Sequence, residues 1–167
     1  LPGNSEVIDF QMQADKSIQL VAEADLIFCT DFNALSRIGA LGELVRQSAA
    51  KKVMIDHHLE PEGFEDFTFW DVRACAAAEL VYRLIVSLGY GHHIDKDIAT
   101  CLYTGIMTDS GSFRFPSTSA EVHRIIADLI DKGANNSRIH ELIYDTNTEN
   151  RLKFLGHVLS QKMVIMA

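Results

Sequence analysis

Three consecutive residues, Asp56, His57 and His58, offer one carboxylate and two imidazoles at a single point of the chain. They follow residues 51–55, a short run with apolar and β-branched residues that predicts a buried strand. Polar groups buried at the end of a strand need partners, and one oxygen ligand with two nitrogen ligands suits a divalent metal and a phosphate. The alternative is a polar turn in which the histidines only hydrogen-bond the loop. The three residues alone do not decide between the two.

Asp31 is a second candidate, because it ends another apolar run at residues 25–30. That run predicts a strand buried on both faces, which is typical of parallel sheets. A helix is predicted over residues 36–49, and it makes a crossover long enough for parallel pairing of the two strands. Open α/β sheets bind ligands at the carboxyl ends of their strands. We therefore expect Asp31 and Asp56 on the same rim of the sheet.

Asp109 is the third candidate, at the end of a helix predicted over residues 97–109. The inward stripe of this helix, which leads to Asp109, consists of Ile98, Leu102, Gly105 and Ile106. The pattern places the acid on the buried side, near a helix end where the macrodipole disfavours negative charge. A bound cation would remove both difficulties. The alternative is a solvent-facing acid in a frayed last turn.

The remaining elements complete an α/β chain. A strand is predicted over residues 67–70, and the last residues, 162–166, resemble the start of another. Further helices are predicted over residues 13–24 (with Ile18, Leu20 and Val21 inward), 76–88, 118–131 (opened by a capping box from Thr118 to Glu121), 137–144 and 148–161. The predicted fold is a parallel sheet with flanking helices followed by a helical segment. We expect residues 1–161 to form one domain and residues 162–167 to begin a linker or strand.

Composition limits the possible functions. The chain has 167 residues, of which 47% are hydrophobic, and its net charge is -8. The negative charge argues against sequence-independent binding to duplex DNA, which requires a basic surface, and no apolar run is long enough for a membrane span. The three cysteines, Cys29, Cys75 and Cys101, are isolated and predict a reducing, cytoplasmic setting.

Three segments of this sequence resemble motifs of the DHH phosphoesterase family: residues 26–38 around Asp31, the Asp56-His57-His58 triplet, and residues 104–115 around Asp109. The similarity is closest to the oligoribonuclease and 3'-phosphoadenosine-5'-phosphate (PAP) phosphatase branch. The resemblance implies two divalent metal ions, with Mn favoured and Mg, Zn and Fe as alternatives. It also implies that Asp31 bridges the two ions, that His57 and Asp109 ligate the second, and that His58 contacts the scissile phosphate. Asp56 would orient the histidines.

The family's first motif, His-x-x-x-Asp-x-Asp, should precede Leu1, and its DHH-associated domain should follow Ala167. The chain is therefore expected to be the middle of a longer protein. By itself it should hold at most one metal ion well and should be weakly active or inactive. Ser110 stands where relatives usually have threonine, and it keeps the hydroxyl.

The substrate is predicted only by class. Ser112 and Arg114, in the loop after Asp109, could contact a phosphate, and a solvated loop is the alternative. The resemblance implies hydrolysis of short single-stranded oligoribonucleotides or small nucleotide phosphates by metal-activated water. Cyclic dinucleotides and polyphosphate are alternatives within the family. A non-catalytic nucleotide- or metal-binding module is the alternative from another class, and the sequence predicts no oligomeric state.

Overall fold

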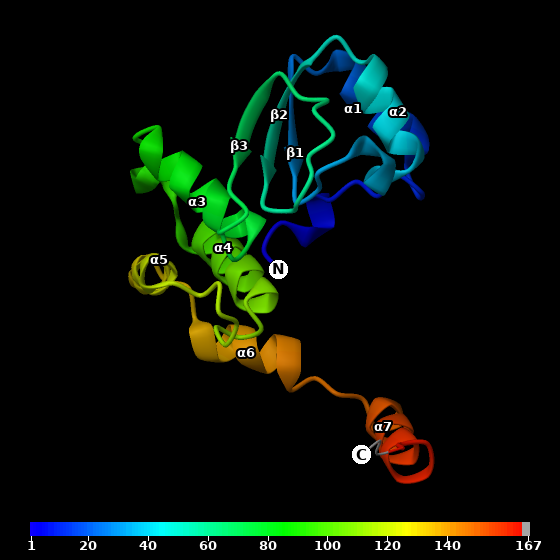
Figure 1. Ribbon diagram of the computed structural model, residues 1–167, viewed down its shortest axis with the longest axis vertical. Coiled ribbons are helices and arrows are strands. Elements are labelled where there is room, and N and C mark those ends of the chain that lie inside the picture. Colours follow the sequence, from blue (N-terminus) through cyan, green and yellow to red (C-terminus); the bar gives the residue numbers. More distant parts are fainter. Residues whose placement is uncertain (165–167) are drawn as a thin grey trace. The chain divides into compact units, whose positions relative to one another are not determined.

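The computed structural model describes residues 1–164 of the chain. It divides into two compact units, Leu1–Ala134 and a second unit that begins at Asn135 (Figure 1). Among the described residues, no helix combines the length and the apolar character that a membrane crossing requires.

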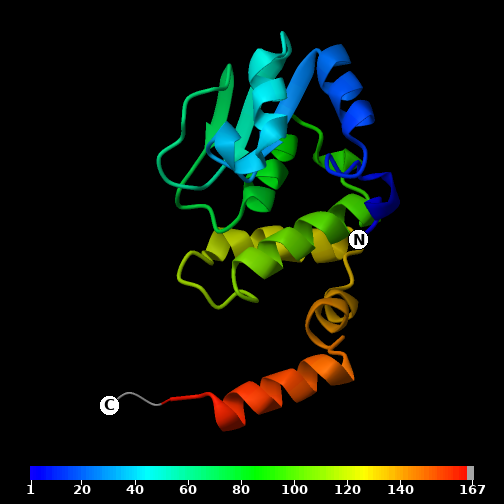
Figure 2. The ribbon, with the colours of Figure 1, turned by 90° about the vertical axis from the view of Figure 1, so that its right-hand side faces the viewer.

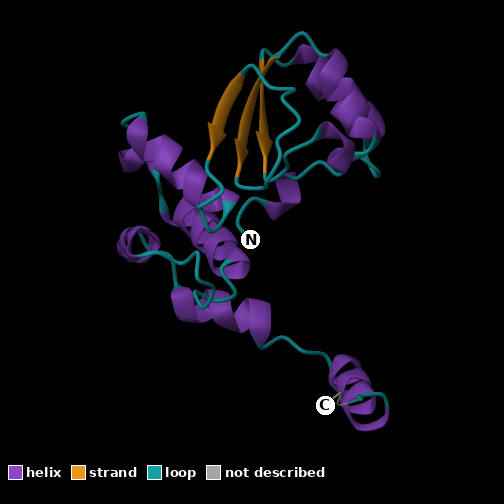
Figure 3. Ribbon diagram, viewed as in Figure 1, coloured by secondary structure: helices purple, strands orange, loops and turns teal. Residues whose placement is uncertain are grey.

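The first unit is built on three parallel strands, β1 (Leu26–Thr30), β2 (Lys51–Asp56) and β3 (Phe67–Trp70), in the order β1-β2-β3 (Figure 3). The predicted parallel α/β arrangement is confirmed. The strands are in a register that pairs Thr30 with Ile55 and Asp56 with Trp70. Because all three strands run in the same direction, the residues that follow them come out at one edge of the sheet.

Helices cover the two faces of this sheet unequally (Figure 2). On one face, α2 (Ala40–Gln47) and the preceding 3-10 turn η2 (Leu35–Ile38) pack on β1. The cluster there has Cys29, Leu35 and Val45 at its centre. On the other face, α3 (Ala77–Ser87) packs on β2 and β3, around Ile55, Ala74 and Leu80.

The prediction that the first strand is buried on both faces is wrong. Cys29 is buried, but Leu26 and Phe28 are 46% and 56% exposed. The register pairs Phe28 with Val53, whose face is the one that α3 covers. Since β1 is an edge strand and α3 lies over β2 and β3, the α3 side of β1 stays open within the part of the chain that the structure describes.

The first helix, α1 (Ala14–Glu23), was also expected to turn Ile18, Leu20 and Val21 inward. Ile18 and Leu20 are instead exposed, and Ser17 is the buried residue of this helix. The physical reason is that α1 packs beside α2, where Ile18 and Val21 line an open groove. That part of the prediction is wrong, although the helix itself is where the pattern placed it.

The helix predicted over residues 36–49 is broken near its start. Gly39 has a φ of 59°, in the left-handed region that favours glycine, and it separates η2 from α2. Gly42, in the next turn, is also required, because a Cβ atom there would lie 2.1 Å from the carbonyl oxygen of Leu35. The 3-10 turn therefore folds directly back against α2.

Two longer helices follow, α4 (Lys96–Asp109) and α5 (Ala120–Asp131), with short 3-10 turns at η1 (Asn4–Glu6) and η3 (Gly91–His93). The predicted capping box is shifted by one residue. Ser119 caps α5, since its side chain accepts a hydrogen bond from the N–H of Val122, and Glu121 forms an ion pair with Arg124 instead of reaching back. Thr118 and Ser119 both carry a hydroxyl group, so the sequence allows either residue to be the cap.

Tyr82 links α3 to α5, because its hydroxyl donates a 2.8 Å hydrogen bond to Oδ2 of Asp128. Burial, together with the Asp128 carboxylate, raises the pKa of Tyr82 to about 12. We expect Tyr82→Phe to lower the free energy of unfolding by about 1.5–3 kcal/mol, the usual range for a hydrogen bond to a charged group. Urea unfolding of the two proteins measures this; an unchanged midpoint and slope would contradict it.

The second unit consists of α6 (Asn136–Tyr144) and α7 (Glu149–Gln161). Their caps are Asn135 and Thr148, whose side chains accept hydrogen bonds from the N–H groups three residues later. Both helices lie where they were predicted. Lys162 to Val164 form no helix or strand, and the rest of the strand expected over residues 162–166 lies outside the described residues.

Candidate metal centre

Asp31 follows β1 directly and adopts an unusual backbone conformation. Its φ is 66°, and its N–H donates to the carbonyl oxygen of Ile55 at 3.1 Å. Positive φ is uncommon for residues other than glycine, and aspartate and asparagine tolerate it better than most. The chain thus turns sharply at the end of the strand. This turn leaves the carboxylate 57% exposed on the rim of the sheet.

Asp56, the last residue of β2, is fully buried. One of its oxygens lies 2.7 Å from Nδ1 of His58, and the other accepts from the backbone N–H of the same residue at 3.2 Å. Nδ1 of His58 therefore carries a proton, and the lone pair of the neutral ring is left on Nε2. The backbone carbonyl of His58 accepts a further hydrogen bond from Nε1 of Trp70 at 2.7 Å. Asp56 thus holds the His58 ring at Nδ1, and Nε2 points away from this contact.

His57 is oriented by a backbone group. Its Nδ1 lies 3.1 Å from the carbonyl oxygen of Ala74, which can only accept, so this nitrogen must carry the proton. Its Nε2 lies 3.5 Å from Oδ1 of Asp31 and 3.8 Å from Oδ2 of Asp109. A single imidazole nitrogen therefore faces two carboxylates from different elements.

Asp109 ends α4, and its side chain is 42% exposed. The prediction that it lies on the buried side is wrong. Gly105 of α4 packs against Ala78, near the start of α3. Asp109 lies one turn further along α4. It therefore lies beyond the first residues of α3, and that helix does not cover it. Partial burial and the negative charge of Asp31 still raise the pKa of the Asp109 carboxyl, against the opposing effect of the histidines.

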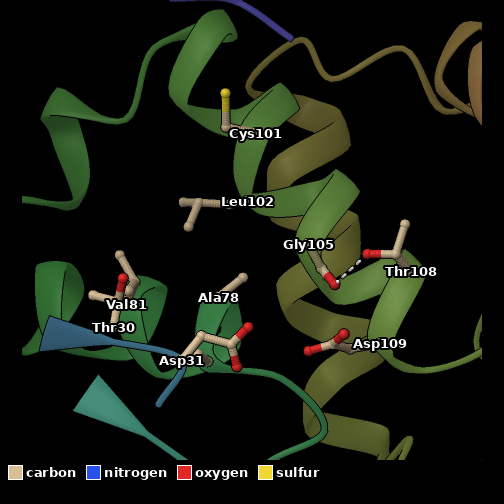
Figure 4. Close-up of a pocket in the computed structure, with 10 residues that line it drawn as sticks. Thr30, Asp31, Ala78, Val81, Cys101, Leu102, Gly105, Thr108 and Asp109 are labelled. Atoms are coloured by element: carbon tan, nitrogen blue, oxygen red, sulfur yellow. Dashed lines mark hydrogen bonds between the residues drawn. The ribbon is translucent and has the colours of Figure 1, made fainter. Parts of the chain in front are cut away.

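Asp31 and Asp109 share one end of a pocket of about 320 Å³ (Figure 4). Figure 4 shows Cys101 and Leu102 at the other end, with Ala78 and Val81 along the wall. The pocket lies between the end of β1 and the two helices α3 and α4. Most of its other lining residues are small or apolar, and the carboxylates give it one strongly polar end.

A metal ion fits these residues. Asp31, His57 and His58 each offer one ligand atom, and the three atoms lie within 4.8 Å of one another. In both histidines Nδ1 is occupied by a hydrogen bond, which leaves Nε2 for a ligand, the arrangement common at metal sites. Asp109 stands outside this group of three but next to His57. Mixed imidazole and carboxylate ligands suit Mn, Fe or Zn better than they suit Mg, which prefers oxygen ligands alone.

The loop after Asp109 is tightly turned. Gly111, Ser112 and Phe113 have φ values of 58°, 60° and 63°. Ser110 is buried, and its Oγ accepts from the N–H of Phe113. Arg114 is exposed and donates from Nε to the carbonyl of Gly111 in its own loop. The contact of Ser112 and Arg114 with a substrate phosphate stays a prediction.

Three groups that support the site were not predicted from the sequence. The Ala74 carbonyl holds His57, and a backbone carbonyl carries no signature in the sequence. Trp70, in the strand predicted over residues 67–70, donates a hydrogen bond to the backbone carbonyl of His58. Glu79 is buried in the first turn of α3, and an acid within an apolar helix start was a signal that could have been followed.

Asp71 anchors the loop that carries Ala74. Its N–H donates to the carbonyl of Asp56, its carbonyl accepts from Ala74, and its carboxylate is bonded by Arg73. The hydrogen bonds from the side chain and backbone of Arg73 hold the pKa of Asp71 at about 2, below its ordinary value.

A carboxyl whose pKa is lowered by folding stabilises the folded state above its unfolded pKa, and this contribution is lost as the pH falls through the folded pKa. For Asp71 the loss runs from about pH 4 down to about pH 2. We expect the stability difference between the wild type and Asp71→Asn to shrink over this window. Urea unfolding at several pH values measures it, and a constant difference would contradict the expectation.

Comparison with known proteins agrees with this geometry. Residues 4–106 match the model of the DHH family, N-terminal domain, a range that contains Asp31 and residues 56–58 and stops shortly before Asp109. The chain is 33% identical over 108 residues to the bifunctional oligoribonuclease and PAP phosphatase NrnA of Thermus thermophilus, a match of 65% of this chain and 32% of that protein. It is 29% identical over 112 residues to the NrnA of Bacillus subtilis, with 66% and 36% covered.

A crystal structure of an exopolyphosphatase-related protein from Bacteroides fragilis matches the fold with a TM-score of 0.95 at 40% identity. It covers 98% of this chain, which spans 48% of that protein, and the chain spans about a third of either NrnA relative. The strand-end acid, the Asp-His-His triplet and the family match over more than half of the chain lead to one conclusion. The chain belongs to the DHH family of phosphoesterases.

Proposed function

We propose that this protein hydrolyses phosphoester bonds in short single-stranded oligoribonucleotides or small nucleotide phosphates, with divalent metal ions, Mn²⁺ foremost, bound at Asp31, His57 and Asp109. The observation that carries the proposal is the convergence of one imidazole nitrogen and two carboxylates, with Nε2 of His57 3.5 Å from Asp31 and 3.8 Å from Asp109. The names of the two NrnA relatives support the substrate class.

Each residue has a part that follows from its contacts. A bound divalent metal would acidify a water molecule and neutralise charge on the phosphate. Asp31 and Asp109 supply the negative charge that attracts the cation, and relief of their mutual repulsion favours its binding. His57 presents Nε2 because Ala74 holds its other nitrogen.

His58 is proposed to contact the phosphate. Protonated on both nitrogens, its ring would donate from Nε2 to a phosphate oxygen while Asp56 accepts from Nδ1. The buried Asp56 thus orients the ring and balances its charge, which is a strong arrangement in a low-dielectric site. His58 is also close enough to Asp31 and His57 to be a metal ligand, and the two roles separate in a binding measurement, since removing a ligand lowers the metal affinity directly.

Polyphosphate is a second candidate substrate, favoured by the description of the Bacteroides fragilis relative as exopolyphosphatase-related. Cyclic dinucleotides remain a third, from the family resemblance. A non-catalytic nucleotide- or metal-binding module is the candidate from a different class. The three free cysteines, Cys29, Cys75 and Cys101, fit a cytoplasmic setting for any of them.

The test uses the complete polypeptide that contains this sequence. Purified protein with Mn²⁺ is given a short end-labelled RNA, 3'-phosphoadenosine-5'-phosphate, polyphosphate or a cyclic dinucleotide, and product release is followed. We expect mononucleotide or phosphate release that His57→Ala reduces by at least about 100-fold, while the exposed His92→Ala keeps wild-type rates. Metal binding without hydrolysis of any substrate would favour the non-catalytic module. Full activity in His57→Ala would refute the assigned site.

A further inference from the structure

Glu79 lies behind the metal centre, in the first turn of α3, and its side chain is only 6% exposed. Its Oε2 accepts a 2.8 Å hydrogen bond from the backbone N–H of Cys75. That N–H belongs to the same peptide unit as the carbonyl of Ala74, which accepts from Nδ1 of His57 at 3.1 Å. A single peptide group therefore joins the Glu79 carboxylate to the His57 ring.

We propose that Glu79 is a positioning residue for the metal centre, which acts through the Ala74–Cys75 peptide to fix the tautomer and the orientation of His57. The inference rests on the proposed metal site. A carboxylate on the N–H side of a peptide polarises it, so its carbonyl becomes a better acceptor. A stronger acceptor at Nδ1 keeps the proton there and leaves Nε2 to face Asp31 and Asp109.

The surroundings explain why a carboxylate can be buried at this point. Nη1 of Arg83 lies 3.6 Å from Oε1 of Glu79 and 3.6 Å from Oδ2 of Asp71. Asp71 in turn accepts from Arg73 and bonds the backbone of Ala74. The charge of Glu79 is thus balanced, and the preceding Arg73–Ala74 peptide is held by the carbonyl oxygen of Asp71. Ala74 and Cys75 are each 4% exposed, so water does not compete for these bonds.

The test measures two properties of Glu79→Gln, Glu79→Met and the wild type. The first is the ¹⁵N spectrum of His57 in the metal-free protein at about pH 8, where an ordinary imidazole is neutral; it reports the tautomer. The second is the Mn²⁺ affinity from calorimetry. We expect Glu79→Gln, which keeps an oxygen acceptor without the charge, to lower the affinity at least about threefold. Glu79→Met removes the acceptor and should lower it about 10- to 100-fold, with a mixed tautomer signal.

Two controls separate positioning from stability. Tyr82→Phe lies one turn along the same helix and weakens its packing on α5 without touching the Ala74–Cys75 peptide. Glu43→Gln changes another first-turn glutamate, on α2. Both should keep the wild-type tautomer and affinity. If Glu79→Met does not fold, Glu79→Gln decides the question alone. Wild-type affinity and tautomer in Glu79→Gln would overturn the inference, whereas a wild type that binds no Mn²⁺ would overturn the proposed site itself.

Discussion

Replacing Asp31 by asparagine should weaken metal binding strongly while leaving the folded chain at least as stable as the wild type. Asparagine accepts a φ of 66° as readily as aspartate does, and the N–H of residue 31 keeps its hydrogen bond to Ile55. The substitution also removes the charge that helps to raise the pKa of Asp109. Loss of a ligand charge next to His57 should weaken Mn²⁺ binding by at least about 100-fold, or about 2.7 kcal/mol.

Calorimetric Mn²⁺ titration and urea unfolding test the two parts of this expectation separately. Asp25→Asn is the matched control, because Asp25 is an exposed acid at the other end of β1 and should change neither quantity. A variant that binds Mn²⁺ like the wild type would remove Asp31 from the ligand set. A variant that binds weakly because it is largely unfolded would show that the left-handed turn, and not the charge, dominates at this position.

Asp56→Asn should behave in the opposite way and lower the stability of the folded chain. Asp56 is fully buried, and its two oxygens accept from the ring and the backbone N–H of His58. An asparagine places an NH₂ group against one of these donors. An unsatisfied buried donor costs about 1–3 kcal/mol, so we expect a loss of about 2–4 kcal/mol when both bonds are disturbed.

Urea unfolding measures the loss of stability, and Mn²⁺ titration under conditions where the variant remains folded measures the effect on the site. We expect the affinity to fall by about 10- to 100-fold if His58 is a ligand, and the rate of hydrolysis to fall without an affinity change if His58 contacts phosphate instead. Asp66→Asn serves as a control, since Asp66 is bonded to Lys51 and Lys52 at the opposite end of the strands. Wild-type stability in Asp56→Asn would contradict its structural role.

The meeting of Asp31 and Asp56 at one edge of the sheet was predictable because it depends on chain direction and strand ends. Asp31 and Asp56 each follow an apolar run, and parallel pairing alone places such residues on one edge. Helical spacing placed Asp109 on the same side of α4 as Leu102 and Gly105, and these three residues do line one pocket. The burial of Asp109 was predicted wrongly, because the spacing does not tell where the neighbouring helix α3 begins.

What could not be predicted depends on tertiary packing and on choices between similar residues. The exposure of Phe28 follows from the position of α3 over other strands, which no local pattern encodes. Ser119 rather than Thr118 caps α5, although both carry a hydroxyl. The support of His57 by Ala74 uses a backbone atom that every residue possesses. Supporting contacts of this kind can be identified only once the fold is known.

The open face of β1 affects how a polypeptide of residues 1–167 alone behaves at high concentration. Among the described residues, β1 is an edge strand of the sheet, and its side chains Leu26 and Phe28 are about half exposed. An apolar edge strand is a template for edge-to-edge pairing between molecules, the usual route to aggregation in sheet proteins. The strand leads directly into Asp31, so such association would also hide a metal ligand. Apparent metal affinity should then fall as protein concentration rises, and dilution series are needed before any affinity is assigned to a single molecule.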